Sequence, residues 1–138
     1  MADTLKLEIV TPETTIYSED VEMVTLPGSE GEAGIYPSHV PLMTRVQAGE
    51  IIVNRGGTEE VVAIGEGFAE ITGDHIAILT DNAANSADID EAAAEEAKAK
   101  AEQRLEEGGD ISEEEAKALT HAILYSRAQI TAKRRKRG

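Results

Sequence analysis

The sequence predicts an α+β fold, with an antiparallel β-sandwich or barrel over residues 1–84 and an antiparallel two-helix hairpin over residues 85–138. Two observations carry this prediction. Short apolar runs separated by glycine-containing turns fill the first part, which is typical of an all-β domain. From residue 89 onward, alanine, glutamate and lysine dominate, and these residues favour helices. The composition changes at Asp81 and Asn82, so we expect two units of different secondary structure.

The β-region opens with a clear alternation at residues 5–10, where Leu5, Leu7 and Ile9 lie on one face of a half-buried strand. A turn at Thr11-Pro12-Glu13 leads to a second alternating run over residues 15–26. Further short extended runs are expected at residues 43–46, 50–54, 59–64, 68–71 and 75–79. Short strands at this spacing, with no helical period between them, indicate a compact antiparallel sandwich or barrel.

Residues 26–42 stand apart because they contain three glycines and three of the chain's four prolines. This composition excludes a helix and allows only short pieces of strand. We expect a turning surface loop with Glu30 and Glu32 at its tip. Its glycines, which would permit positive φ at repeated turns, are Gly28, Gly31 and Gly34. The apolar residues expected to pin the loop to the domain are Ile35, Tyr36, Val40 and Leu42.

This loop carries no catalytic motif. The glycine spacing fits neither phosphate-binding pattern, and no lysine follows. His39 lies between two prolines, and such a histidine more often hydrogen-bonds its own loop than transfers protons. The three histidines lie far apart in the sequence, and no motif of a hydrolase or a zinc enzyme is present. We therefore expect no catalytic centre and no cofactor; a small hydrolase using His39 with a nearby carboxylate is the enzymatic alternative.

Composition limits the partners. A net charge of −14 argues against a nucleic-acid binder, because phosphates would repel the chain. The absence of cysteine excludes disulfides and thiolate chemistry. No run of about 18 apolar residues and no targeting leader are visible, so any membrane attachment is expected to be indirect.

The helical region divides into two segments. The first covers residues 89–105, begins at Asp88 with Glu91 three residues later, and ends at Gly108-Gly109. The second begins at Ser112 and runs to about residue 134. The residues expected in the seam between them are Ala94, Ala97, Ala101, Leu105, Ala116, Leu119, Ile123, Ser126 and Ile130. So many alanines bury little apolar area, so the hairpin is either a detachable element or a rigid cap.

The chain ends in a basic segment. Residues 125–138 contain no acidic residue and six basic ones, which are Arg127, Lys133, Arg134, Arg135, Lys136 and Arg137. Three interpretations stay open: a solvated tail that complements the helix dipole, a surface that docks onto an acidic protein, or a nucleic-acid contact.

The sequence GSEGEAGIYPSHVPL resembles a family signature, that of the epsilon subunit of the bacterial F-type ATP synthase, close to G-E-x-G-I-x-P-x-H-x-P-L. Its fixed positions are filled by Gly31, Glu32, Gly34, Ile35, Pro37, His39, Pro41 and Leu42. Residues 21–24, 65–71 and 88–90 also resemble family segments, so the resemblance extends along essentially the whole chain.

This resemblance implies a ten-stranded β-sandwich that binds the rotating gamma subunit and the top of the c-ring, at the cytoplasmic face of the bacterial inner membrane. It implies a non-catalytic subunit whose hairpin folds back on the sandwich or extends into the alpha/beta catalytic head and inhibits ATP hydrolysis. The residues implied to face gamma and the c-ring are Glu30, Gly31, Glu32, Gly34, Ile35, Tyr36, Pro37 and His39. Those implied to meet acidic residues of the head are Arg127, Lys133, Arg134 and Arg135.

One position departs from the family pattern. Members that bind ATP carry a segment resembling [IL]-D-x-x-R-A, which here begins with Ile89 and Asp90 but has Ala93 in place of the arginine. Loss of a charged donor commonly costs a few kcal/mol of binding. The sequence thus argues against regulatory ATP binding. The alternative to the whole reading is a free-standing ligand-binding β-sandwich with a regulatory hairpin.

Overall fold

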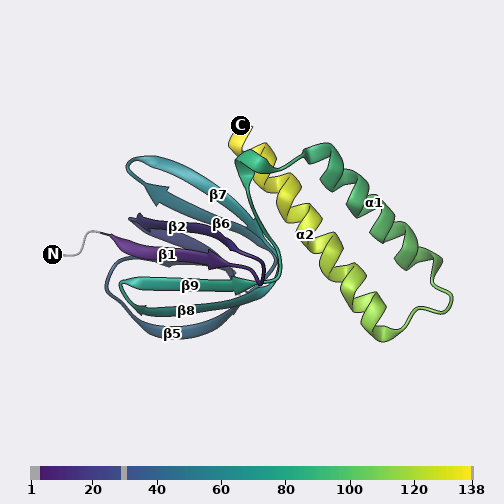
Figure 1. Ribbon diagram of the computed structural model, residues 1–138, viewed down its shortest axis with the longest axis horizontal. Helices are drawn as coiled ribbons and strands as arrows, with labels where there is room; N and C mark the ends of the chain where they lie inside the picture. The colour runs from purple at the N-terminus through teal and green to yellow at the C-terminus, as the bar shows by residue number, and fades with distance from the viewer. Residues whose placement is uncertain (1–3, 29–30, 138) are drawn as a thin grey trace.

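The computed structural model describes residues 4–28 and 31–137, and within them ten strands form two five-stranded sheets that pack face to face (Figure 1). The first sheet has the order β2 (Thr15–Val21), β1 (Leu5–Val10), β9 (His75–Thr80), β8 (Gly67–Gly73) and β5 (His39–Val46). The second has the order β10 (Ala83–Asn85), β7 (Thr58–Ile64), β6 (Gly49–Arg55), β3 (Met23–Gly28) and β4 (Gly31–Ile35). The predicted ten-stranded sandwich is confirmed.

One strand pair differs from the antiparallel prediction. Among the described strands, β1 and β9 pair in parallel, with Leu7 opposite Ile76 and Ile9 opposite Ile78, whereas the other pairs are antiparallel. A parallel pair needs a long connection, and here the chain between them builds seven other strands. Alternation in the sequence shows the buried face of a strand but not the direction of its neighbour.

The single run expected over residues 15–26 is in fact two strands in different sheets. The chain leaves β2 at Val21 and enters β3 at Met23, so it crosses between the sheets at Glu22, whose N–H donates to the carbonyl of Asn54 at 2.8 Å. Val21 and Val24 are both fully buried. The buried positions change phase at the crossing, from Tyr17 and Val21 in β2 to Val24 and Leu26 in β3, and the prediction of a single run missed this break in the alternation.

The expected surface loop at residues 26–42 is mostly strand. Strands β3 and β4 form a hairpin, and β5 starts at His39. The prolines are compatible with these strands because each lies at a position where no backbone N–H is needed for a hydrogen bond to a neighbouring strand. Pro27 lies beyond the last β3–β6 pair, Thr25 with Ile52, and Pro41 lies on the edge strand β5 where its register shifts. Of the three glycines, Gly31 alone has a positive φ, of 112°.

The core between the sheets is aliphatic, as predicted. Its largest fully buried side chains include Leu5, Leu7, Ile9, Leu26, Ile51, Ile64, Ile71 and Ile76. The aromatic contribution is Tyr17, which is 8% exposed, while the chain's one phenylalanine, Phe68, is 47% exposed. The core formed by the described residues is therefore filled mainly by branched aliphatic side chains.

The helices follow a short 3₁₀ turn, Ser86–Asp88, and are α1 (Glu91–Glu107) and α2 (Glu113–Arg137). Asp90, and not Asp88, caps α1, since its Oδ1 accepts from the N–H of Ala93 at 3.1 Å. The predicted end at Gly108 is confirmed by its φ of 63°. The predicted start of α2 is confirmed too, because the N–H of Glu115 donates to Ser112 Oγ at 3.0 Å.

The seam between the helices is as thin as expected but differs in detail. Ala94 and Ala101 are buried, whereas Ala97 is exposed. On α2 the buried residues of the expected face are Ile123, Ser126 and Ile130. Helix α2 also has a second buried face, with Ala128 and Ala132 against the sandwich. The hairpin is therefore folded back, with the C-terminal half of α2 beside β6 and β7 (Figure 1).

Candidate functional site

The signature residues gather at one corner of the sandwich, where β4 ends and β5 begins. Strand β4 is an edge strand, and its Gly31, Glu32 and Gly34 are exposed. Ile35 is buried in the core, and Pro37 and His39 are half-buried. Glu30 lies outside the described residues. The structure thus brings the described signature residues together on one continuous segment of the surface.

The apolar side chains of this segment were expected to point inward, and three of the four do not. Ile35 is 2% exposed, but Tyr36, Val40 and Leu42 are 59%, 70% and 44% exposed. Met43, on the outer side of β5, adds another side chain with 66% exposure. We call Tyr36, Val40, Leu42 and Met43 the apolar corner. Exposed apolar residues are candidates for an interaction surface, and here they lie on both sides of the strand, because Leu42 and Met43 are consecutive on β5.

Sequence reasoning missed this surface because it treated the segment as a loop. Had residues 39–46 been predicted as a strand, its alternation would have placed Met43 on the outward side. Val40, three residues earlier, falls on the other side of a regular strand, and its exposure accompanies the register shift between His39 and Leu42. Such residues on an edge strand are an aggregation hazard unless a partner covers them.

The turn at the corner is held by defined contacts. Ser38 has a φ of 66°, and its N–H donates to Asp74 Oδ1 at 2.6 Å, which ties the turn to the end of β8. His39 Nδ1 lies 2.6 Å from the carbonyl oxygen of Val40. This bond is the contact with its own segment that the sequence predicted for His39. No carboxylate bonded to His39 is found in the described part of the chain, so the contacts give no acid–base pair there.

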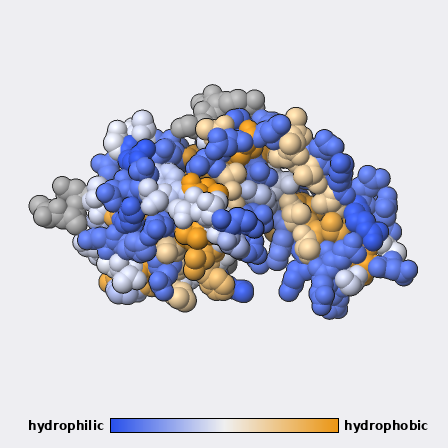
Figure 2. Space-filling model, viewed as in Figure 1, coloured by the Kyte–Doolittle hydropathy of each residue, from blue (hydrophilic) through white to orange (hydrophobic). Residues whose placement is uncertain are grey.

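A groove of about 730 Å³ lies farther along the first sheet, between the end of the sandwich and α2. Arg45, Phe68 and Leu79 occupy neighbouring strands in one row, with the Arg45 guanidinium 5.6 Å from the Phe68 ring centre. On the opposite wall His121 of α2 lies 3.3 Å from Glu66. Figure 2 shows a narrow strip of hydrophobic residues on the side of the sandwich that is nearer the helices, further hydrophobic residues among the helices, and hydrophilic residues over most of the remaining surface. The groove is a boundary between the two units and does not enter the core.

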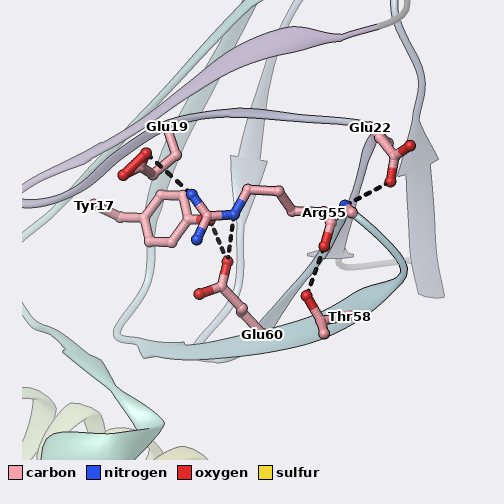
Figure 3. Close-up of polar contacts among 7 residues, drawn as sticks. Tyr17, Glu19, Glu22, Arg55, Thr58 and Glu60 are labelled. Atoms are coloured by element: carbon pink, nitrogen blue, oxygen red, sulfur yellow. Dashed lines mark hydrogen bonds and ion pairs between the residues drawn. The ribbon is translucent and has the colours of Figure 1, made fainter.

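A cluster of polar side chains around Arg55 joins the two sheets (Figure 3). Arg55, at the end of β6, contacts Glu19 of β2 at 3.0 Å and Glu60 of β7 at 3.3 Å. Burial raises the pKa of the Tyr17 hydroxyl, and its hydrogen bond to Glu60 adds to the effect. Each charged group here has a partner of the opposite sign, so the cluster is an inter-sheet clamp and not a reactive centre.

Two further properties bear on function. Among the described residues, no group of three or more His, Cys, Asp or Glu side chains could hold a metal ion. In the same part of the chain, neither helix is long and apolar enough to span a bilayer.

The basic residues of α2 are placed differently from one another. Arg127 is exposed and makes no ion pair within residues 4–28 and 31–137. Lys133, Arg134 and Arg135 all contact other parts of the same chain. Of the nucleotide motif, Ile89 is buried against the sandwich and Asp90 is engaged in capping α1.

Comparisons with known proteins agree with the resemblance. Residues 4–86 match the family described as ATP synthase, Delta/Epsilon chain, beta-sandwich domain. The chain is 41% identical over 125 residues to the ATP synthase epsilon chain of Desulforamulus reducens, covering 90% of this chain and 95% of that one. It is 40% identical over 136 residues to the ATP synthase epsilon chain of Laribacter hongkongensis, covering 96% and 97%.

Solved structures show the same fold. A chain of the Euglena gracilis mitochondrial ATP synthase, solved by cryo-EM as OSCP/F1/c-ring in rotational state 1, superposes with a TM-score of 0.76 at 21% identity, covering 96% of this chain and 82% of that one. A chain of the Tetrahymena thermophila mitochondrial ATP synthase central stalk/c-ring gives 0.57 at 11% identity, covering 93% and 95%. The resemblance read from the signature is confirmed by the family match and by the relatives at about 40% identity, and the chain belongs to the ATP synthase delta/epsilon family.

Proposed function

We propose that the chain is a non-catalytic central-stalk subunit of an F-type ATP synthase, which links gamma to the c-ring and so couples proton flow to ATP synthesis. The observation that carries the proposal is the 40% identity to an epsilon chain over 96% of this chain, helices included. In this role residues 1–84 act as the rotor-binding unit and residues 85–138 as the regulatory one. No substrate is turned over, and the protein works by holding two partners in a fixed orientation.

The apolar corner is the proposed contact with gamma and the c-ring. It is supported by the four exposed apolar side chains and by the tight Ser38–Asp74 bond, which fixes the turn before any partner binds. The signature residues assigned to this contact are Glu30, Gly31, Glu32, Gly34, Ile35, Tyr36, Pro37 and His39. Ile35 would act from the core, by holding the corner in shape, because its side chain is buried.

The hairpin is the proposed brake on ATP hydrolysis. Its four cationic contacts to the alpha/beta head would be Arg127, Lys133, Arg134 and Arg135. The thin alanine seam supports a hairpin that opens, since it buries little apolar area. Opposite charge on the head would steer the extended hairpin into place.

The proposed location is the cytoplasmic face of the bacterial inner membrane, as a peripheral subunit. Support comes from the bacterial form of the signature and from the bacterial relatives. The contact with the membrane would be made through the c-ring and not by this chain.

The function is tested by ATP hydrolysis of a reconstituted alpha/beta/gamma head with no addition, with the full chain, or with a chain ending at Ala87. Inhibition by the full chain, with binding but no inhibition by the truncated one, is the expected result. If both chains bind and neither inhibits, the coupling role is retained and the proposed inhibition by the hairpin is rejected. Failure of both to bind, in a folded state, would refute the proposal.

The corner is tested separately with Val40→Asp, which places a charge on a side chain that is 70% exposed. We expect about tenfold weaker binding to a gamma–c-ring complex, because the carboxylate must be desolvated in the contact. Ser18→Asp on β2, at the opposite edge of the same sheet, is the matched control and should bind normally. Equal binding by both variants would show that the corner is not the contact.

A further inference from the structure

The hairpin rests on the outer face of the second sheet through a small apolar patch. Ala128 and Ala132 of α2 pack against Val61 and Ala63 of β7, together with Ile89 of the linker. Three of these five side chains are alanine, and Ala84 and Tyr125, which pack against them, are only partly buried, so the apolar area that holds α2 is modest. The charged contacts around the patch must therefore decide much of the balance between docked and released states.

The strongest of these contacts joins Arg135 to Glu50 of β6. Arg135 Nε lies 2.8 Å from Glu50 Oε2, and Nη2 lies 3.3 Å from Oε1, so the pair is bidentate. The Glu50 side chain is 12% exposed, which shields the pair from water more than an ordinary surface ion pair.

Two further carboxylates on the outer face of the second sheet, those of Glu59 and Glu32, favour the positive charge of Arg135. Side chains alternate across a strand, so Glu59 shares the outer face of β7 with Val61 and Ala63. The hydrogen bond to Glu50 raises the pKa of Arg135, and the charges of Glu59 and Glu32 raise it further. We call Glu32, Glu50 and Glu59 the acidic seat.

The two residues before Arg135 reach two other elements. Lys133 Nζ donates to the carbonyl oxygens of Ser86 and Ala87 in the linker, at 3.2 and 3.4 Å. Arg134 contacts Glu91 and Glu95 of α1, both at 3.1 Å. Three consecutive cations thus bind the linker, the first helix and the sandwich.

We propose that Lys133, Arg134 and Arg135 form an ionic latch, in which Arg135 is seated on Glu50 and its acidic neighbours, and that this latch holds the hairpin down without a nucleotide. The latch belongs to the isolated chain. Its consequence for the brake rests on the proposed function: the same cations cannot bind their partners within the chain and an acidic partner at once, so the latch competes with the head for them. Arg127, which is outside the latch, is free to bind the head in either case.

The latch is tested by the distance between two spin labels on the full chain, which has no native cysteine. Glu13→Cys in the β1–β2 turn and Asp110→Cys between the helices are both exposed attachment sites. In about 0.05 M salt we expect one narrow distribution of distances, and in about 1 M salt a second population at a different distance, because salt screens the ion pairs. Mg-ATP at millimolar concentration should leave both populations unchanged.

Glu50→Gln should raise the ratio of released to docked chains about two- to fivefold at low salt. Glu96→Gln is the matched control, because it removes a carboxylate from an exposed ion pair with Lys100 that lies within α1, and it should change nothing. Exchanging the charges, with Glu50→Arg and Arg135→Glu together, should restore docking. The latch would be overturned if Glu50→Gln gave the same distance distribution as the parent chain at low and at high salt. A shift of the parent chain's distribution by Mg-ATP would overturn it too.

The proposed function fails in a different way. If Glu50→Gln releases the hairpin but does not inhibit a reconstituted head more strongly than the parent chain, then the latch stands and the brake does not. If Arg127→Gln weakens inhibition while the label distance stays the same as in the parent chain, the separate role of Arg127 is supported. Circular dichroism of each variant shows whether the fold is intact.

Discussion

Tyr17 and Glu60 bind the two sheets to each other. The Tyr17 hydroxyl on β2 donates to Glu60 Oε1 on β7 at 2.7 Å, and Arg55 lies against the same carboxylate (Figure 3). Burial is the main reason that the pKa of Tyr17 is raised. The folded chain therefore keeps this proton at a pH where the unfolded chain loses it. The free energy of unfolding of the sandwich should therefore fall as the pH rises above about 10, the pKa of tyrosine in the unfolded chain.

Replacing Tyr17 with Phe tests this dependence. At pH 8 we expect a loss of about 1 kcal/mol in the free energy of unfolding, for the lost hydrogen bond. The contribution of Tyr17 is fully present below about pH 10, the unfolded pKa, and is lost as the pH rises toward the folded pKa. Urea denaturation at pH 8, 10 and 11 should show a shallower alkaline decline in Tyr17→Phe. Burial also raises the pKa of Tyr125, so some decline remains.

The control for this measurement is Tyr36→Phe, since Tyr36 is 59% exposed. Its unfolding curves should follow those of the parent chain at each pH. An equal alkaline decline in Tyr17→Phe and the parent chain would show that Tyr17 does not cause the pH dependence.

Gly67 gives a prediction on packing. A Cβ at this position would lie 2.0 Å from the carbonyl oxygen of Leu79, a backbone atom that cannot turn aside. Gly67→Ala should therefore lower the free energy of unfolding by about 3 kcal/mol. At Gly65 the nearest atom would be 3.5 Å away, an ordinary contact, so Gly65→Ala should cost less than about 1 kcal/mol. Thermal denaturation of both variants checks the difference, and equal losses would contradict it.

These two glycines show where sequence reasoning ends. The turn at residues 65–67 was predicted correctly because two glycines interrupt an apolar pattern. Which glycine is essential depends on Leu79, a residue of the neighbouring strand β9, and no local pattern gives that distance. The helix ends could be predicted from the sequence because caps are local. Ser112 and Gly108 act on their own turns.

The role assigned to the signature residues stays a prediction, whereas their orientation can be compared with the structure. The inward orientation expected for Tyr36, Val40 and Leu42 was wrong. The exposure of these side chains depends on how the two sheets pack in the folded sandwich, which the local pattern of glycines and prolines does not give. In the same way, the contact of Arg135 with Glu50 joins residues that lie far apart in the chain.

Asp90 gives a prediction on the start of α1 and on nucleotide. Asp90→Ala should lower the free energy of unfolding by about 1 kcal/mol, because the N–H of Ala93 loses its acceptor.

Millimolar Mg-ATP should leave the unfolding midpoint of the parent chain unchanged, because Ala93 offers no charged donor. Binding at a hundredfold excess over Kd would stabilise the chain by about 2.7 kcal/mol, which urea denaturation detects easily. A rise of that size would show that ATP binds despite Ala93.

Ala132 gives a prediction on the apolar part of hairpin docking. Its side chain is fully buried against β7, in the patch with Val61 and Ala63. Ala132→Leu adds three carbon atoms where the backbone of α2 lies close to the sheet, so overpacking of about 1–3 kcal/mol should push α2 away. Ala122→Leu, at an exposed position of the same helix, is the control. Hydrogen exchange should then become faster at residues 61–63 and 128–132 in Ala132→Leu alone, while the strands β1, β8 and β9 keep their protection. Unchanged, slow exchange at residues 128–132 in Ala132→Leu would contradict the prediction. It would mean that the contact between α2 and β7 adapts to a larger side chain.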